Sequence, residues 1–162
     1  MRYFLVLMVV LLPLTGCGVF GGMDRDKLSA SQLYERAKSN LDRGSYQEAV
    51  ELYETLEARF PFGRFARQAQ LETAYAYYKF GEPDSAIAAA DRFIKLHPHD
   101  PNVAYAHYLK GLANFERGHG LFDRLLGKAR SDVDPSPMRE AFRDFATLFK
   151  RYPNSEYAAD AR

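Results

Sequence analysis

The chain has one cysteine, Cys17, and no tryptophan in 162 residues. A single thiol excludes an intramolecular disulfide, and one Cys with four scattered His excludes the usual ligand sets of zinc. Its stability must therefore come from packing. A hydrophobic fraction of 47% and a charged fraction of 27% are those of an ordinary globular chain.

An excess of charge of either sign is also missing. Arg2 is the only charged residue before Cys17, and the sequence from Cys17 onward carries 21 basic and 21 acidic side chains. This balance lacks the basic surface of a nucleic-acid-binding protein. Glycine-rich phosphate loops and the HExxH, GxSxG and CxxC motifs are absent as well. We expect neither an enzyme nor a cofactor or metal site.

A short apolar segment precedes the cysteine. Arg2 gives the segment a positive start, and residues 3–14 are apolar and interrupted only by Pro13. This pattern predicts a lipoprotein signal peptide over residues 1–16, since a membrane-spanning helix needs roughly 20 apolar residues. The sequence Leu-Thr-Gly-Cys at 14–17 resembles the bacterial lipobox.

The lipobox resemblance implies that Cys17 becomes the mature N-terminus and carries acyl chains. Each buried methylene contributes about 0.8 kcal/mol, so several chains hold a protein on a membrane almost permanently. Gly18 follows the cysteine, where an Asp is typical of retention in the inner membrane. We therefore expect a lipid-anchored protein on the periplasmic face of an outer membrane, with a lipidated, flexible tether over residues 17–28.

The remaining sequence repeats with a period of 37 residues. Ala37, Gly44, Ala49 and Pro61 of the first copy recur 37 residues later as Ala74, Gly81, Ala86 and Pro98. A third copy begins after another 37 residues with Gly111 and Gly118. Its second half keeps the Ala-to-Pro spacing but comes 18 residues late, at Ala141 and Pro153. Such a period is typical of stacked helical repeats. We predict an all-α solenoid of helical hairpins over 29–61, 62–98 and 99–153, with an insertion near 119–136.

Each copy is predicted to contain two helices joined near its glycine. Two pairs, Ser29 with Gln32 and Ser45 with Glu48, match the capping box at helix starts. The small residues Ala37, Ala74 and Gly111 are expected where the first helix of a pair closely approaches its partner. The second helix of the first copy has one apolar face at helical spacing, formed by Ala49, Leu52, Tyr53, Leu56 and Phe60.

The order of small, aromatic and proline positions resembles the tetratricopeptide repeat, which ordinarily runs about 34 residues. Here the period is longer, and Leu33 stands at the usual early Trp position. Residues 154–162 match the start of another first helix, because Tyr157 and Ala158 follow Pro153 as Phe65 and Ala66 follow Pro61. We expect a fourth repeat to begin there and the chain to be a fragment of a longer protein.

Two loops contain residues of the kind that bind metals. The sequence HPHD at 97–100 lies at a helix end, where polar residues are normal, and RSDVDP at 130–135 lacks the Gly and Glu of a calcium loop. For the second we expect a turn in which an Asp accepts backbone N–H bonds and Ser136–Pro137 open a helix. An apolar face inside the insertion is expected to pack under the solenoid or to dock a partner: Leu121, Phe122, Leu125 and Leu126.

Aromatic residues gather on the predicted first helices. If these helices line the inner face of the solenoid, the candidate peptide groove comprises Tyr34, Tyr75, Tyr78, Lys79, Tyr105, Tyr108 and Phe115. Tyr combines apolar area and a hydroxyl with a low entropic cost of ordering, which suits binding of an extended or partly helical peptide. The alternative for each aromatic residue is a place in the core.

Three stretches together are similar to one family: RFPFGRFARQAQLETAYAYYKFG at 59–81, DRFIKLHPHDPNVAYAHYLKGL at 91–112, and the segment from RSDVDP to YPNSEYAADAR at 130–162. With the lipobox, they resemble the BamD (ComL-type) lipoproteins of the machine that assembles β-barrel proteins in the outer membrane. The resemblance implies a non-enzymatic subunit that binds the periplasmic domains of BamA, other assembly lipoproteins and unfolded barrel substrates.

Two alternatives remain open at this point. One is an outer-membrane-anchored tetratricopeptide adaptor of the Tol-Pal or peptidoglycan-remodelling system, whose repeats also carry Tyr-Pro helix ends. The other is a lipoprotein enzyme whose catalytic domain lies outside this sequence, although nothing in residues 17–162 supports it.

Overall fold

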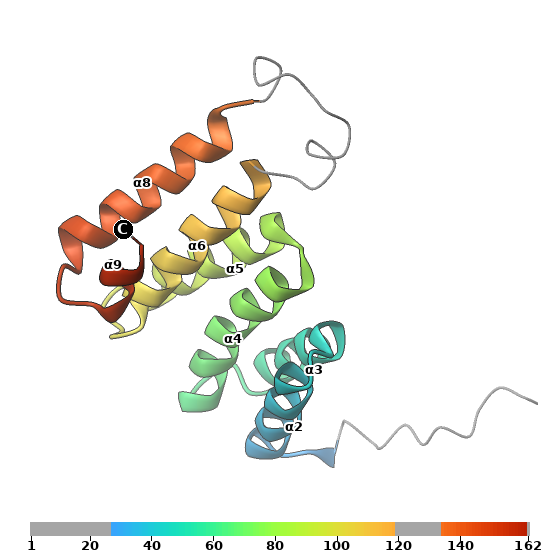
Figure 1. The fold of residues 1–162 in the computed structure, drawn as a ribbon. Helices are drawn as coiled ribbons and strands as arrows, with labels where there is room; N and C mark the ends of the chain where they lie inside the picture. Colours follow the sequence, from blue (N-terminus) through green and yellow to red (C-terminus); the bar gives the residue numbers. More distant parts are fainter. Residues whose placement is uncertain (1–26, 119–133, 162) are drawn as a thin grey trace, which may run out of the picture.

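The computed structural model describes residues 27–118 and 134–161. The helices in these ranges form a solenoid without any strand (Figure 1). In chain order they are α2 (Ala30–Asp42), α3 (Tyr46–Arg59), α4 (Arg64–Phe80), α5 (Pro83–Leu96), α6 (Val103–Gly118), α8 (Ser136–Arg151) and α9 (Glu156–Asp160). The prediction of an all-α solenoid of tetratricopeptide-like hairpins is confirmed.

The first helices of the successive hairpins, which are α2, α4, α6 and α9, form the inner side of the solenoid. Each helix packs along the next one in the chain, and α2 also contacts α4, α4 contacts α6, and α6 contacts α9. No comparable contact joins α3, α5 and α8 to one another within the described ranges. The first helices therefore lie closer together than the second helices, which curves the row toward the side of α2, α4, α6 and α9.

Two turns between helices are Schellman motifs built on glycine. Gly44 and Gly81 have φ of 80° and 82°, in the left-handed region that favours Gly. After the first of them, the Ser45 amide donates to the carbonyl of Asn40 at 2.9 Å, as the motif requires. Gly118, at the equivalent position of the third copy, is still helical and does not form such a turn.

Of the two predicted capping boxes, the first is confirmed and the second is wrong. Ser29 Oγ accepts from the Gln32 amide at 3.3 Å, and Gln32 Oε1 accepts from the Ser29 amide at 3.0 Å. Ser45 makes no such cap, and its ψ of 68° is not the extended conformation of a capping residue. The reason lies in the preceding turn, where the Schellman bond already uses the Ser45 amide that Glu48 would have engaged.

The small residues at the 37-residue period lie inside the core, as predicted. Ala37 and Ala74 are fully buried, and a Cβ on Gly111 would overlap the ring of Phe145 on α8. The predicted apolar face of α3 is buried from Ala49 to Leu56, with Phe60 packed at its edge. In α8 the corresponding Ala141 is buried too, so the 18-residue delay leaves the packing of the second helix unchanged.

Leu28 belongs to the core of the described part of the chain. It is buried with Leu33 and Ala66 in the cluster of the first hairpin, and so differs from the prediction that the tether extends to residue 28. None of the described helices is long and apolar enough to cross a membrane. The signal peptide, the lipidation site Cys17 and the insertion residues Leu121, Phe122, Leu125 and Leu126 lie outside the described residues.

Candidate functional site

A face rich in tyrosine runs along the first helices. We call it the tyrosine face and define it by Tyr34 of α2, Tyr75 and Tyr78 of α4, Tyr105 and Tyr108 of α6, and Tyr157 of α9. All six side chains are partly buried, so each has one side on the core and another open to solvent. On α4, Gln68, Glu72, Tyr75 and Lys79 follow the i, i+4, i+7, i+11 spacing of one helix face.

Ring contacts between repeats recur at equivalent positions of this face. The Tyr34 ring lies 5.5 Å from that of Phe65, the first apolar residue of α4. Two repeats further on, the Tyr108 ring lies 5.5 Å from that of Tyr157, which is also 4.9 Å from the ring of Tyr105. Such tilted and offset pairs are favourable for aromatic side chains. The same aromatic contact thus joins the first repeat to the second and the third helix pair to α9.

Glu72 is an acidic group in the middle of the tyrosine face. Its charge raises the pKa of Tyr34 from one side and of Tyr105 from the other, in addition to the larger effect of burial on each. Burial raises the pKa of Glu72 itself, although a hydrogen bond from Gln68 opposes the shift. The face therefore offers a carboxylate, an amide and several hydroxyl groups between apolar rings.

The tyrosine hydroxyls stay protonated at neutral pH. Burial, with Glu116 as the next contributor, raises the pKa of Tyr78 to about 12. A hydrogen bond from the Tyr108 hydroxyl to Asp160 raises the pKa of Tyr108 to about 12 as well. Because the Tyr108 hydroxyl already donates its proton to Asp160, its oxygen remains as an acceptor for a backbone N–H group of an unfolded chain.

The structure brings most of the sequence-predicted groove residues together. Tyr75 packs against both the first and the second core cluster. Lys79 is exposed at the end of α4, and Phe115 is exposed near the end of α6. They lie near the C-terminal ends of these helices, at the rim of the face.

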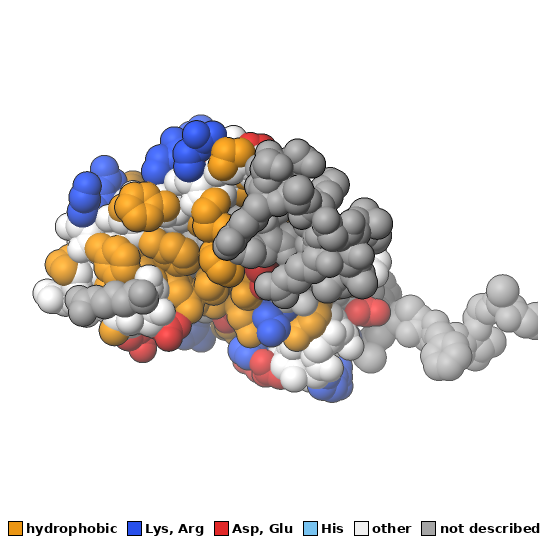
Figure 2. All heavy atoms as spheres, turned by 45° about the horizontal axis from the view of Figure 1, so that its top comes forward, with side chains coloured by type: hydrophobic (Ala, Val, Ile, Leu, Met, Phe, Trp, Pro, Cys, Tyr) orange, Lys and Arg blue, Asp and Glu red, His pale blue; other side chains and the backbone are white. Residues whose placement is uncertain are grey.

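Figure 2 shows hydrophobic side chains in a continuous band across the part of the molecule formed by α6, α8 and α9. Basic side chains border the band on one edge and acidic side chains on the other. Phe142 of α8 is among the exposed apolar residues, at 74% of its surface. The apolar surface of the third repeat is thus larger than the tyrosine face alone.

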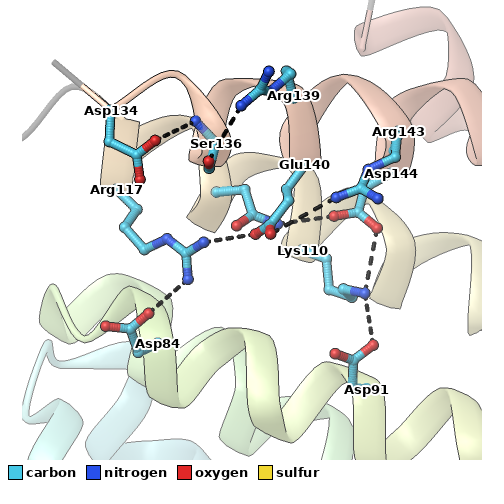
Figure 3. A network of polar contacts seen from close by, with 11 residues as sticks. Asp84, Asp91, Lys110, Arg117, Asp134, Ser136, Arg139, Glu140, Arg143 and Asp144 are labelled. Atoms are coloured by element: carbon cyan, nitrogen blue, oxygen red, sulfur yellow. Dashed lines mark hydrogen bonds and ion pairs between the residues drawn. The ribbon is translucent and has the colours of Figure 1, made fainter.

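A charged network holds α8 in place (Figure 3). Lys110 of α6 bridges Asp91 of α5 at 2.6 Å and Asp144 of α8 at 3.3 Å. One heptad later, Arg117 bridges Asp84 of α5 at 2.8 Å and Glu140 of α8 at 2.6 Å. Lys110 and Arg117 of α6 thus each connect a carboxylate of α5 to a carboxylate of α8, although the insertion separates α6 from α8 in the sequence. Asn114, between them, donates to Asp144 at 2.9 Å.

The two loops with candidate metal ligands have structural partners. His97 Nε2 is 2.7 Å from Gln70 Oε1, and Asp100 pairs with Arg67 at 3.2 Å. Asp134 accepts from the Ser136 amide at 2.9 Å, directly before α8, as the predicted turn requires. Among the residues that the structure describes, no three His, Cys, Asp or Glu side chains are grouped as metal ligands.

Sequence reasoning missed three features of the site. Glu72 was overlooked, although it precedes Tyr75 by one helical turn. Tyr157 and Asp160 were read only as a helix start, and their contacts with Tyr108 depend on the fold of α9 onto α6. The charged network had a sequence signal, because Asp84 and Asp91 share the seven-residue spacing of Lys110 and Arg117.

Comparison with a family model gives a match to YfiO, described as outer membrane lipoprotein, over residues 26–162. Proteins named outer membrane protein assembly factor BamD are similar along most of the chain. The one from Neisseria meningitidis serogroup A is 46% identical, over 99% of this chain and 62% of that protein.

More distant relatives carry the same name. The one from Vibrio cholerae is 39% identical, over 82% of this chain and 55% of that protein, and the one from Haemophilus influenzae is 33% identical, over 97% and 60%. The chain therefore spans about six tenths of the length of the curated relatives it matches.

Proposed function

The chain belongs to the YfiO family of outer membrane lipoproteins, and we propose that it acts as a non-enzymatic scaffold in the assembly of outer membrane β-barrel proteins. The observation that carries the proposal is the tyrosine face, together with the relatives named as assembly factors. In this role the solenoid binds partner subunits and unfolded barrel substrates.

The tyrosine face suits an unfolded barrel strand. Such a strand has alternating aromatic side chains and an unpaired backbone, because it has not yet joined its sheet. Rings from α4, α6 and α9 offer apolar contact area, while protonated hydroxyls and the amide of Gln68 offer hydrogen bonds to the backbone. Partial exposure of every ring allows binding without insertion into the core.

We further propose that Cys17 is lipidated and that the anchor holds the solenoid at the periplasmic face of the outer membrane. Support comes from the lipobox-like sequence at 14–17 and from the family's description as outer membrane lipoproteins. The partners proposed there are the periplasmic domains of BamA and other assembly lipoproteins. We assign no residues of this chain to the BamA contact.

Residues 154–162 are proposed to begin a fourth repeat. Val50 of α3 and Phe142 of α8 occupy the same repeat position, yet Val50 is 6% exposed and Phe142 is 74% exposed. The full-length helix α4 packs against α3, whereas α9 is described only over Glu156–Asp160. In a longer protein, continuation of α9 would protect a cysteine introduced at position 142 from thiol reagents.

Affinity purification of the full-length, lipidated protein from outer membranes in mild detergent tests the assembly role. We expect a β-barrel protein with periplasmic repeat domains among the co-purifying proteins. Recovery of Tol-Pal components or murein enzymes without such a protein would instead support the adaptor alternative and contradict the proposal.

Alanine substitutions on α4 test the groove. Replacement of Tyr75 and Tyr78 is expected to weaken binding of an aromatic, barrel-derived peptide about tenfold or more, because each ring loses its contact area. Tyr77 is the matched control, since it lies on the same helix but its hydroxyl donates to Glu54 of α3 at 2.8 Å. Equal binding by the double variant and the wild type would contradict the groove.

A further inference from the structure

The loop between α3 and α4 exposes a large aromatic side chain. Phe62 is 91% exposed, although Phe60 and Phe65 on either side pack against the first core cluster. Pro61 precedes it, and Gly63 follows with a φ of 106°, which favours Gly. The backbone is therefore shaped so that Phe62 points away from the fold. No other repeat has an aromatic residue here, since His99 and Asn154 occupy the equivalent positions.

The surroundings of Phe62 are basic. Residues 58–71 contain three Arg and no acidic residue. The guanidinium of Arg59 lies 5.0 Å from the ring centre of Phe60, and that of Arg64 lies 4.6 Å from the ring centre of Phe65. The guanidinium of Arg64, held on the Phe65 ring, has the planar edge that binds a phosphate with two parallel hydrogen bonds.

The nearby acidic residue does not cancel this charge at the surface. Asp100 pairs with Arg67, but the Asp100 side chain is almost fully covered and the Arg67 side chain remains about half exposed. A hollow of about 260 Å³ separates the loop from Gln70 and His97. An exposed phenyl ring, cationic groups and a shallow hollow thus occur together.

This loop lies at the end of the solenoid where α2 begins. Figure 1 shows the starts of α2 and α4 at the same edge of the molecule, and Leu28 shares a core cluster with Ala66 of α4. The sequence between Cys17 and Leu28 reaches at most about 40 Å when fully extended. A membrane anchor at Cys17 can therefore bring this edge, where the described chain begins, to the lipid surface.

We propose that the Phe62 loop is a membrane-contact site, in which Phe62 enters the interface of an anionic phospholipid surface and Arg64 binds a lipid phosphate. Aromatic rings favour the boundary between headgroups and acyl chains, and basic residues near an anionic surface each strengthen binding about fivefold. This contact would fix the orientation of the solenoid on the membrane. The inference rests on the lipid anchor and not on the tyrosine face.

Tryptophan fluorescence tests the contact directly, because residues 1–162 contain no Trp. The full-length, lipidated protein carries Phe62→Trp in a background free of other tryptophans, and is reconstituted into vesicles of phosphatidylethanolamine and brominated phosphatidylglycerol. Phe80→Trp is the matched control: Phe80 is 47% exposed at the other end of α4, about 24 Å away. Both positions are exposed, so neither substitution disturbs the core.

We expect bromine quenching at position 62 to exceed that at position 80 at least threefold. Arg64→Glu should reduce the quenching at position 62 by about half or more, as should replacement of the anionic lipid by phosphatidylcholine. Equal quenching at positions 62 and 80, or quenching unaffected by either change, would overturn the proposal. Burial of the Trp at position 62 only after a partner protein is added would overturn it too, and would assign the loop to a protein contact. None of these results bears on peptide binding by the tyrosine face, so the two proposals fail separately.

Discussion

A Cβ atom on Gly111 would lie 2.4 Å from Cε1 of Phe145, closer than real side-chain contacts allow. Gly111 belongs to α6 and Phe145 to α8, so the absence of a side chain on one helix makes room for the ring on the other. In the first two hairpins the same position of the first helix is Ala, and the residues equivalent to Phe145 are Tyr53 and Ala90. In the third hairpin the missing methyl group lets the Phe145 ring approach the backbone of α6 directly.

Gly111→Ala is expected to destabilise the protein by about 1–3 kcal/mol, because the Phe145 ring must leave its place. Denaturant unfolding measures the change. Gly118→Ala is the control, since its Cβ would meet Met138 only at an ordinary 3.5 Å and Ala favours the helix. Shortening Phe145 to Leu should relieve much of the defect in the double variant; additive effects of the two substitutions would contradict the contact.

Lys110→Met is expected to cost about 1–3 kcal/mol of unfolding free energy, since it leaves the largely covered Asp144 with one fewer donor. Burial lowers the pKa of Lys110, but Asp91 and Asp144 outweigh it and raise that pKa above its ordinary value. Lys38→Met is the control, because Lys38 pairs with Asp42 at an exposed site and should contribute less than about 0.5 kcal/mol. Equal losses in the two variants would show that the network adds nothing to α8.

Ser29→Ala should lower stability by about 1 kcal/mol, because the substitution removes a complete capping box at the start of α2. Ser45→Ala should have little effect, since Ser45 makes no side-chain cap at the start of α3. Thermal unfolding followed by circular dichroism distinguishes the two. A larger loss at Ser45 than at Ser29 would be inconsistent with the observed turn.

The hairpins could be predicted from the sequence because their signals are local. The 37-residue period, the glycines of the two Schellman turns and the spacing of apolar residues in α3 each lie within one repeat. The Ser45 box failed because two local signals compete for one amide, and only the geometry after Gly44 decides between them. Sequence spacing alone does not contain that geometry.

The candidate site was predicted less completely because it is formed between repeats. The helical positions of Tyr75 and Tyr105 follow from periodicity, but their nearness to Glu72 depends on how α4 packs beside α6. In the same way, Tyr108 reaches Asp160 across 52 residues of sequence. Contacts of this kind follow from the curvature of the solenoid, which a single repeat does not specify.

Acid is expected to weaken the fold partly through His107. Its Nδ1 is buried without a hydrogen-bond partner, and burial, with Lys110 as the next cause, lowers its pKa below the ordinary 6.5. As the pH falls through 6.5, His107 becomes protonated in the unfolded chain but stays neutral in the folded protein. Stability present above pH 6.5 is therefore lost as the pH falls toward the depressed pKa of the folded state.

The free energy of unfolding of the wild type should thus decline more steeply between pH 7 and pH 5.5 than that of His107→Gln. Burial raises the pKa of Glu57 and Glu72, which acts in the opposite direction at lower pH, and the difference between two proteins cancels this shared effect. Parallel curves for wild type and His107→Gln would refute the assignment.

Site-specific photo-crosslinking in living cells tests the central claim most directly. A benzophenone amino acid at position 75 or 105 of the full-length protein places the probe on the tyrosine face, and position 46 on α3 serves as the control away from it. We predict adducts with unfolded outer membrane β-barrel precursors at positions 75 and 105 and few or none at position 46. Absence of precursor adducts from both face positions, with the protein folded and anchored, would contradict the account.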